Sequence, residues 1–250
     1  MDCNLFSAEA QQAIKAKTEP VDAVIELENV AFSYGFSSNE LLADISLKLS
    51  PGSFHFLTGP SGAGKTTFLK LCYGALVPTA GRIQLFSEDL RQMSRDSIAM
   101  SRRRIGVVHQ DCQFVDHLNV YDNISLPLNV VGDGQIADLS NLKDLLGWVG
   151  LTTRAKAFPA ELSGGERQRA ALARAVVMSP DVILADEPTG NIDWEMSQRL
   201  LHLLVELNRM GKTVMIATHD MSLIRAAKTL VQARVLRISN RRLQLAGADL

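Results

Sequence analysis

A glycine-rich segment at residues 59–67 has the residue types needed to bind a chain of phosphates. It reads Gly59, Pro60, Ser61, Gly62, Ala63, Gly64, Lys65, Thr66 and Thr67. This order fits the spacing G-x-x-x-x-G-K-[ST]. Glycines let successive backbone N–H groups turn toward a phosphate, and a helix that starts after the loop adds the positive end of its dipole. Lys65 can reach the outer phosphates and the Thr66 hydroxyl can bind Mg²⁺. The segment therefore predicts a nucleotide site, without separating an ATPase from a GTPase or a kinase.

Two acidic residues, Asp186 and Glu187, follow the apolar run at residues 182–185. Such an unbroken run is typical of a central parallel strand, whose carboxyl end opens on the ligand crevice. Charges beside a hydrophobic strand are costly unless an ion or a partner compensates them. Asp186 is suited to hold Mg²⁺ through a water molecule, and Glu187 to orient or deprotonate the attacking water. We therefore expect hydrolysis of the bound nucleotide; the alternative is a solvated acidic pair at a strand end.

A second glycine pair lies at the start of an alanine-rich helical segment, residues 166–178. Its residues are Ser163, Gly164, Gly165 and Glu166. A serine and glycines at a helix start can bind an anion, although the same residues also suit an ordinary N-cap and turn. Because residues 59–67 already bind the phosphates of one nucleotide, this second anion site indicates that a second copy of the chain takes part.

Hydrophobic periodicity predicts the elements that would position these residues. Expected strands are residues 24–30, 45–49, 54–57, 83–86, 105–108, 182–185 and 213–217, expected helices are 68–73, 166–178 and 194–209, and a hairpin is expected within 231–245. Strands that alternate with helices predict a parallel sheet covered on both faces. Residues from about 112 to 162 are polar and turn-rich, with helical stretches such as 141–149, and indicate an inserted, mostly helical lobe. We predict one α/β domain over residues 23–245, with a flexible lead-in at 1–22 and a tail at 246–250.

Composition limits the function. The chain has 250 residues, of which 46% are hydrophobic and 21% charged, and its net charge is −1. This balance gives no general attraction to nucleic acid or to anionic lipid. The three scattered cysteines, Cys3, Cys72 and Cys112, fit reduced thiols in the cytosol better than a disulfide framework. No segment reaches the roughly 18 consecutive apolar residues of a membrane span, so a membrane role would require a partner that supplies the spans.

Residues 162–169, together with 59–67 and 182–187, resemble the motifs of the ABC ATPases, with Glu166 where many members have glutamine. The resemblance covers about residues 24–245. It implies the fold of an ABC-type P-loop ATPase: α/β, with a mostly parallel core sheet, an N-terminal antiparallel β subdomain and an inserted helical subdomain. It also implies that the chain binds ATP and Mg²⁺. Two copies would meet head to tail, so that each ATP lies between the glycine-rich loop of one copy and the second glycine pair of the other.

The resemblance also implies roles for single residues. Tyr34 looks like the aromatic residue that stacks on adenine, and Gln110 like the glutamine that senses Mg²⁺ and the γ-phosphate. His219 looks like the histidine that contacts the γ-phosphate. Asp193, in the segment 190–193, resembles the loop residue that contacts the partner copy. The implied catalytic residues are Glu187, His219 and Gln110, and the implied metal-binding residues are Thr66, Gln110 and Asp186.

Within the family, the segments 56–59, 61–67, 120–124, 184–191 and 217–220 are most similar to the cell-division ATPases. This similarity implies a peripheral subunit on the cytoplasmic face of the inner membrane, paired with an integral membrane subunit in a complex that controls peptidoglycan hydrolases. The sequence leaves open a lipoprotein-releasing or efflux complex of the same family, and a nucleotide-dependent scaffold that does not hydrolyse ATP. DNA-repair and ribosome-associated members are disfavoured, because those usually carry coiled coils or a second ATPase domain.

Two further expectations concern the surface. The segments 114–118 and 126–128, which follow Gln110, are candidates for the groove that receives a helix of the membrane subunit. The basic residues Arg91, Arg95, Arg102, Arg103 and Arg104 are expected to form a solvated face. The alternative is that these arginines contact phospholipid head groups or the membrane subunit.

Overall fold

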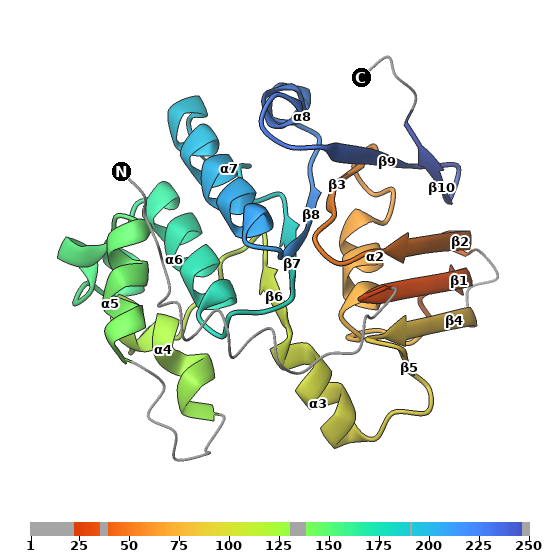
Figure 1. Ribbon diagram of the computed structural model, residues 1–250, viewed down its shortest axis with the longest axis horizontal. Coiled ribbons are helices and arrows are strands. Elements are labelled where there is room, and N and C mark those ends of the chain that lie inside the picture. The colour runs from red at the N-terminus through yellow and green to blue at the C-terminus, as the bar shows by residue number, and fades with distance from the viewer. Residues whose placement is uncertain (1–22, 36–39, 131–138, 191, 247–250) are drawn as a thin grey trace.

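The computed structural model describes residues 23–35, 40–130, 139–190 and 192–246. The predicted lead-in at residues 1–22 and the last four residues of the predicted tail lie outside the described residues. Figure 1 shows two sheets with one helix between them, and most of the other helices on the opposite side of the larger sheet. Among the helices in the described ranges, none combines the length and the apolar character needed to cross a membrane.

The larger sheet has six strands and forms the centre of the molecule. In spatial order the strands are β10 (Arg242–Leu245), β9 (Ala233–Ser239), β3 (Phe54–Thr58), β8 (Thr213–Ala217), β7 (Val182–Asp186) and β6 (Ile105–Val108). All neighbours pair in parallel except β9 and β10, which form an antiparallel hairpin. Every residue of β3, β7 and β8 is buried. Burial on both faces explains why these strands read as apolar runs rather than as alternating patterns.

The smaller sheet is antiparallel and packs against one side of the helix that follows the glycine-rich loop. Its strands, in spatial order, are β2 (Leu42–Leu49), β1 (Ile25–Phe32), β4 (Ala80–Leu85) and β5 (Glu88–Asp89). Helix α2 (Lys65–Cys72) lies between the two sheets (Figure 1). One core contains Ile25 of the smaller sheet, Phe68 of α2 and Leu184 of the larger sheet. Because it is packed from both sides, α2 has a fixed position relative to the strand ends of the larger sheet.

Helices cover the opposite face of the larger sheet. They are α6 (Gly164–Val176), α7 (Trp194–Arg209) and α8 (Met221–Lys228). A second core joins these helices to Phe56 and Ile216 of the sheet. Helix α6 passes so close to β6 that a Cβ atom on Gly106 would lie 2.2 Å from the backbone oxygen of Ala175. Only glycine fits at this crossing.

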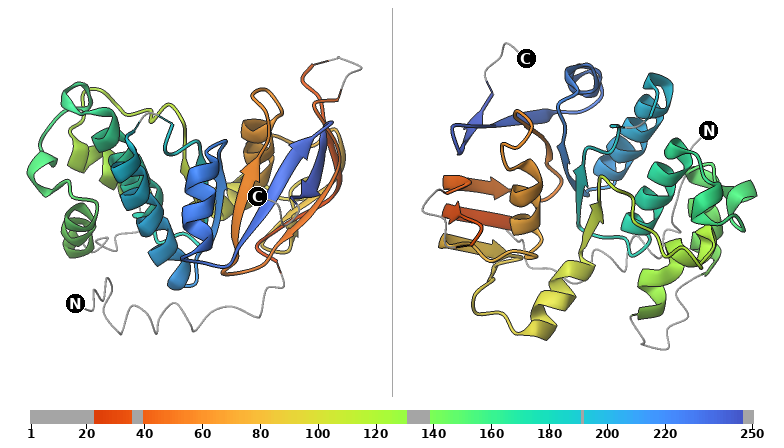
Figure 2. Two further views of the ribbon diagram at one scale, coloured as in Figure 1. Left: turned by 90° about the horizontal axis from the view of Figure 1, so that it is seen from above. Right: turned by 180° about the vertical axis from the view of Figure 1, so that it is seen from behind.

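A mostly helical lobe packs on α6. It consists of α4 (Val120–Val130), α5 (Leu139–Trp148) and two short 3₁₀ turns, η1 (Thr152–Arg154) and η2 (Pro159–Glu161). Helix α4 contacts α6 directly. The views in Figure 2 place this lobe at the end of the molecule away from the smaller sheet.

The topology confirms the predicted fold class: a mostly parallel core sheet, an antiparallel sheet from the N-terminal part, and an inserted helical portion. The limits of α7 and β8 agree with the predicted ones. Among the described residues outside the helical lobe, the elements that were not predicted include β5, α8 and α3 (Arg95–Arg103). The limits of the domain and of the inserted lobe stay predictions.

The expected arginine face is open to solvent: Arg91, Arg95 and Arg102 are exposed, and Arg103 and Arg104 are partly exposed. Arg91 and Arg102 donate hydrogen bonds to backbone carbonyl oxygens at 2.9 Å and 2.6 Å. Arg104 pairs with Asp181 at 2.7 Å. These three arginines therefore also hold neighbouring segments of the chain together, while they stay in contact with solvent.

Candidate functional site

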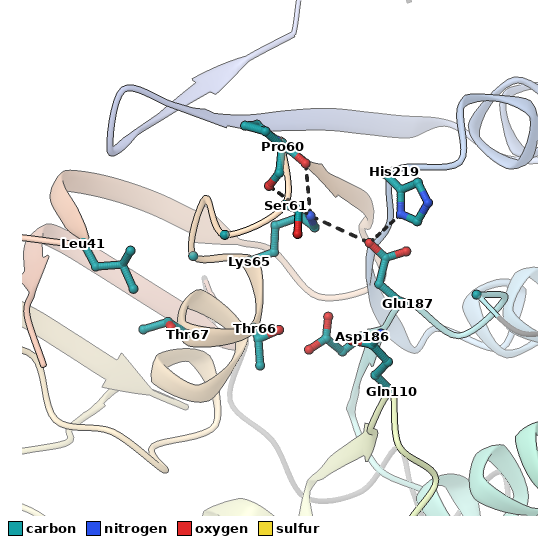
Figure 3. Close-up of a pocket in the computed structure, with 14 residues that line it drawn as sticks. Leu41, Pro60, Ser61, Lys65, Thr66, Thr67, Gln110, Asp186, Glu187 and His219 are labelled. Atoms are coloured by element: carbon teal, nitrogen blue, oxygen red, sulfur yellow. Dashed lines mark hydrogen bonds and ion pairs between the residues drawn. The ribbon is translucent and has the colours of Figure 1, made fainter.

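A pocket of about 540 Å³ lies where the strands β3, β6, β7 and β8 give way to loops at their carboxyl ends (Figure 3). Its lining residues are Leu41, Gly59, Pro60, Ser61, Gly62, Gly64, Lys65, Thr66, Thr67, Gln110, Asp186, Glu187, Gly190 and His219. The cavity thus brings together the glycine-rich loop, the acidic pair and two of the single residues assigned by resemblance. Ala63 does not line the cavity; it packs against the core instead.

The backbone of the loop between β3 and α2 depends on glycines with a positive φ, among them Gly59 and Gly64. Gly59 has a φ of 150°, and a Cβ atom there would lie 2.8 Å from the backbone oxygen of Ile238. Gly64 has a φ of 98° and directly precedes the first residue of α2. L side chains are rarely compatible with positive φ. The loop therefore closes around the N-terminal end of α2, where free N–H groups and the helix dipole favour an anion.

The Lys65 ammonium group lies above this loop. Its Nζ atom donates to the carbonyl oxygens of Gly59 at 3.0 Å and Pro60 at 3.4 Å. The same atom lies 3.7 Å from Glu187 Oε1, and both side chains are only 11% exposed (Figure 3). A lysine has three N–H donors and no acceptor, so the group can turn toward phosphate oxygens placed on the loop.

Asp186 is buried at the end of β7 and has an unused oxygen. The residue is 6% exposed, and Oδ1 finds no hydrogen-bond partner among the described residues. Burial raises the pKa of the Asp186 carboxyl above its usual range; a hydrogen bond from Thr66 opposes this rise, and the charge of Glu187 adds to it. A buried carboxylate oxygen beside a threonine hydroxyl fits a hard cation such as Mg²⁺, which prefers oxygen ligands.

Glu187 is held in the pocket by contacts with β8 and with His219, in addition to the contact with Lys65. Its backbone N–H donates to the oxygen of Ala217 in β8 at 2.8 Å. Its Oε1 atom lies 3.0 Å from His219 Nδ1 (Figure 3). The residue has a φ of 46°, a strained backbone conformation of the kind that concentrates at functional sites. A carboxylate held in this way can accept a proton from a water molecule in the pocket.

Gln110 and Tyr34 were both assigned to the nucleotide site by resemblance, but only Gln110 lines the pocket. Gln110 lines it beside Asp186 (Figure 3). Tyr34 is not among the lining residues. Its hydroxyl group forms a hydrogen bond with Thr67 Oγ1 at 3.1 Å, and its ring meets Phe32 edge-on at 4.8 Å. The residue is 53% exposed, so the ring is tied to the start of α2 with one side open to solvent.

The second glycine pair lies at the N-terminal end of α6, outside the pocket. The backbone N–H of Glu166 donates to Ser163 Oγ at 3.3 Å, and that of Ser163 donates to Glu166 Oε2 at 2.8 Å. This reciprocal arrangement is a capping box. The hydrogen bond from the Ser163 backbone lowers the pKa of Glu166, and Arg154, 3.0 Å from Glu166 Oε1, lowers it further.

Asp193 caps the next helix. The backbone N–H of Met196 donates to Asp193 Oδ1 at 2.8 Å, at the start of α7. Asp193 does not line the pocket, and Asn191 of the same loop lies outside the described residues. One chain therefore assembles the glycine-rich loop, the acidic pair, Gln110 and His219, but not the residues expected to act on a second copy.

Sequence patterns missed one lining residue, Leu41. It lies beside the start of β2, and a Cβ atom on Gly64 would lie 3.4 Å from Leu41 Cγ. A leucine next to a strand is ordinary core in a sequence pattern. Its place in the pocket follows only from the packing of the smaller sheet against α2.

Comparison with known proteins agrees with this geometry. Residues 42–190 match the family described as ABC transporter. The "Cell division ATP-binding protein FtsE" of Escherichia coli (strain K12) is 42% identical over 201 residues, which cover 80% of this chain and 90% of that protein. Proteins of the same name from Bacillus subtilis and Mycobacterium tuberculosis are 39% and 42% identical over 210 and 197 residues. These alignments cover 84% and 79% of this chain, and 92% and 86% of the relatives.

Two solved structures share the fold. The "dimeric structure of a post-hydrolysis state of the ATP-binding cassette MJ0796 bound to ADP and Pi" has a TM-score of 0.79 and 29% identity, and covers 89% of this chain and 99% of its own. The "dimeric structure of MJ0796, a bacterial ABC transporter cassette" has a TM-score of 0.79 and 30% identity, with coverages of 88% and 96%. The relatives above carry the cell-division name, and none of them favours the lipoprotein-releasing or efflux alternative. The chain therefore belongs to the ABC transporter family, as an ATP-binding and ATP-hydrolysing subunit similar to FtsE.

Proposed function

We propose that two copies of this ATPase close head to tail around two ATP molecules and thereby act on an integral membrane subunit similar to FtsX. The observation that carries this proposal is the separation of two anion-binding features within one chain. Lys65 and Glu187 share the pocket, whereas Ser163 at the start of α6 lies outside its lining. A nucleotide seated on residues 59–67 would meet Ser163 from a second copy. The solved neighbours described as dimeric support this arrangement.

Each nucleotide would be held by groups from both copies. The glycine-rich loop of one copy takes the phosphates, and Tyr34 takes the adenine ring on its open side. Thr66, Asp186 and Gln110 hold Mg²⁺, which when bound neutralises phosphate charge. The second copy contributes the N-terminal end of α6, with Ser163, Gly164, Gly165 and Glu166. Asp193 contacts the opposite copy at the adjoining helix start.

Hydrolysis would use groups that already touch one another. Glu187 accepts the proton of the attacking water, because its carboxylate faces the cavity and is fixed by the contact with His219. His219 also contacts the γ-phosphate, and Gln110 lines the same wall as Asp186. Loss of the γ-phosphate removes the group that bridges the two copies, so the pair opens.

The energy needed for closing is within reach of these contacts. Shifting a two-state equilibrium from 1:99 to 99:1 takes about 5.5 kcal/mol of differential affinity. Hydrogen bonds to charged groups contribute about 1.5–3 kcal/mol each. A few such bonds from the second copy to each triphosphate would supply this difference.

The membrane partner is inferred from the relatives. Proteins named cell division ATP-binding protein match most of this chain. We therefore place the chain at the cytoplasmic face of the inner membrane, as a peripheral subunit of a complex that controls peptidoglycan hydrolases during cell division.

A mixing experiment tests the shared site. Lys65→Ala and Ser163→Arg are each expected to abolish ATP hydrolysis alone. In a mixed pair, one of the two sites combines an intact lysine with an intact serine. An equimolar mixture should recover roughly a quarter of wild-type activity, since half of the pairs are mixed and each has one intact site. No recovery would contradict a site shared between copies.

The membrane partner has its own test. The FtsX-like subunit of the same organism is coexpressed with the chain, extracted in detergent and purified through the chain. We expect a stable complex that contains two copies of the ATPase. If ATP-loaded Glu187→Gln protein stays monomeric at high concentration, with the membrane subunit present, the proposed pairing is wrong.

A further inference from the structure

A second hollow, of about 560 Å³, is lined by His109, the residue before Gln110 of the nucleotide pocket. Its walls come from α3, β6, α4 and α6. Leu126 and Pro127, from the segment 126–128 that we predicted to receive a helix of the membrane subunit, line it, whereas the residues 114–118 do not. Val130, at the end of α4, is 71% exposed beside it. We refer to this hollow as the α4–α6 groove.

The charged residues of the α4–α6 groove all have one sign. Arg102, Arg103 and Arg174 line it, and no aspartate or glutamate of the described chain does. His109 also lines it, but burial lowers the pKa of His109 and favours the neutral ring. The other lining residues are alanine, glycine, proline, methionine and branched apolar residues. A groove of this composition suits one apolar face of a helix with an acidic group at a defined position.

Arg174 differs from the neighbouring arginines in its contacts. Arg102 donates to the backbone oxygens of Tyr73 and Gly74, and Arg103 donates to Met100 Sδ. The Arg174 guanidinium lies 4.8 Å from the centre of the Phe114 ring. Among the described residues, no carboxylate or carbonyl oxygen is a hydrogen-bond or ion-pair partner of this guanidinium.

The surroundings of Arg174 make an unpaired charge unfavourable. The residue is half-buried, and this burial lowers the pKa of its guanidinium. A partly desolvated cation costs free energy unless an anion compensates it. The ring of Phe114 supplies only part of that compensation, because Arg167 lies 5.4 Å from the centre of the same ring. The planar group still offers a pair of N–H donors that match a carboxylate.

We propose that the helix of the membrane subunit that docks in the α4–α6 groove carries a carboxylate that pairs with Arg174. This inference rests on the proposed function, because it specifies the chemistry of the membrane partner named there. The carboxylate enters a site whose cation already lies against the Phe114 ring, so the pair sets the register of the docked helix. The apolar walls hold the remainder of that helix.

The groove favours a protein helix over a lipid head group. Anionic membranes attract clusters of about four to eight free basic residues. Here the guanidinium groups of Arg91 and Arg102 donate hydrogen bonds to backbone carbonyl oxygens, and that of Arg104 pairs with Asp181. Of the other two groove arginines discussed above, Arg103 donates to Met100 Sδ, whereas Arg174 is half-buried against Phe114 within apolar walls. Arg174 therefore fits a single carboxylate on a helix.

The test uses the complex of the full chain with the FtsX-like subunit. Arg174→Glu should weaken the complex at least about tenfold, because an acidic side chain would face the docked carboxylate. Each aspartate and glutamate of the cytoplasmic segments of the membrane subunit is then changed in turn to arginine. One of these changes should restore binding to Arg174→Glu while weakening binding to the wild-type chain.

Two further variants keep the test decisive. Arg174→Met removes the charge without adding a new one, and carries the test if Arg174→Glu does not fold, as judged by thermal unfolding of the isolated chain. Arg199→Glu is the control, because Arg199 is 62% exposed on α7 and pairs locally with Glu195. We expect Arg199→Glu to bind the membrane subunit as the wild type does.

Three results would overturn or redirect the inference. If Arg174→Glu and Arg174→Met bind like the wild type, or if no charge exchange restores binding, the pairing is wrong. If Arg174→Glu loses binding to vesicles of phosphatidylglycerol and phosphatidylcholine but keeps the protein complex, Arg174 serves lipid and the pairing is wrong. Absence of a complex with the wild-type chain would count against the proposed function itself, and the pairing would fall with it.

Discussion

His219 Nδ1 lies 3.0 Å from Glu187 Oε1, and the same oxygen lies 3.7 Å from Lys65 Nζ. One carboxylate oxygen therefore joins the loop after β8, the end of β7 and the start of α2. These three elements approach each other because β7 and β8 are neighbouring parallel strands and α2 packs against one face of the sheet that contains them. A substitution at Glu187 is thus expected to affect both proton transfer and the position of Lys65.

Glu187→Gln is expected to keep ATP binding and lose hydrolysis. The amide retains the shape of the side chain but cannot accept a proton from water. Loss of a general base typically lowers the rate about 10²- to 10⁴-fold, or about 3–5 kcal/mol of barrier. Phosphate release and ATP titration measure the two effects separately. The control is Glu195→Gln, an exposed acid in the first turn of α7. Turnover of the Glu187→Gln protein above half that of the wild type would remove Glu187 from this role.

Lys65→Ala is expected to lose nucleotide binding itself. Lys65 is the cation that the pocket holds over the glycine-rich loop. Two hydrogen bonds to charged phosphate oxygens, each of about 1.5–3 kcal/mol, correspond to at least about 100-fold in affinity. Isothermal titration with ATP measures this change. Lys70→Ala, in the last turn of the same helix, should bind ATP like the wild type. Tight ATP binding by Lys65→Ala would contradict the assignment of the phosphate loop.

The parts of the fold and site that sequence could predict are those with a local signal. The glycine-rich loop, the acidic pair after β7 and the amphipathic α7 each have their spacing within one segment. Helix α3 was missed because it is arginine-rich and buries only Ser101, so it has no apolar stripe. The sequence did contain one signal for the start of this helix, the N-cap residue Ser94, whose side chain accepts a hydrogen bond from the backbone N–H of Ser97.

Contacts between distant segments had no signal of this kind. Phe114 and Arg174 are far apart in sequence, and their contact depends on how the segment before α4 packs on α6. The same holds for Tyr34, whose hydroxyl group is bound by Thr67. Motif spacing assigned Tyr34 a role but could not give the position of its ring.

Asp186→Asn is expected to stabilise the chain while it abolishes ATP hydrolysis. The pKa of Asp186 is raised in the folded state, mainly by burial. A raised pKa means that the folded state binds the proton more tightly than the unfolded state does. The free energy of unfolding therefore falls as the pH rises from 3.8, the pKa of Asp186 in the unfolded state, through its higher pKa in the folded state. Above both pKa values the loss of stability is complete. A neutral asparagine does not suffer this loss.

Thermal unfolding in the absence of nucleotide and Mg²⁺ measures this gain. Each kcal/mol raises Tm by about 2–4 °C in a chain of this size. The difference between Asp186→Asn and the wild type should grow with pH through that window and then stay constant. A lower Tm for the variant at pH 7 would show that the charged form of Asp186 is stabilised in the fold, contrary to this prediction.

His55 should make the fold sensitive to acid. It lies on β3, opposite Met215 of β8 and Arg234 of β9, and is 1% exposed. Its Nδ1 atom has no hydrogen-bond partner among the described residues. Burial, with a smaller contribution from the charge of Arg234, lowers the pKa of His55 from 6.5 to about 4. The folded state thus holds the neutral ring at a pH where the unfolded state already binds a proton.

The resulting loss of stability has a defined pH window. Stability from His55 is complete above pH 6.5 and falls as the pH drops toward about 4, by about 3 kcal/mol in total. His55→Phe removes the titrating group and keeps a planar ring. Urea unfolding between pH 7.5 and 4.5 should therefore show a shallower decline for His55→Phe than for the wild type. His202→Phe, at an exposed position on α7, should give a pH curve closer to that of the wild type. If His55→Phe loses stability as steeply as the wild type over this range, His55 does not cause the acid sensitivity.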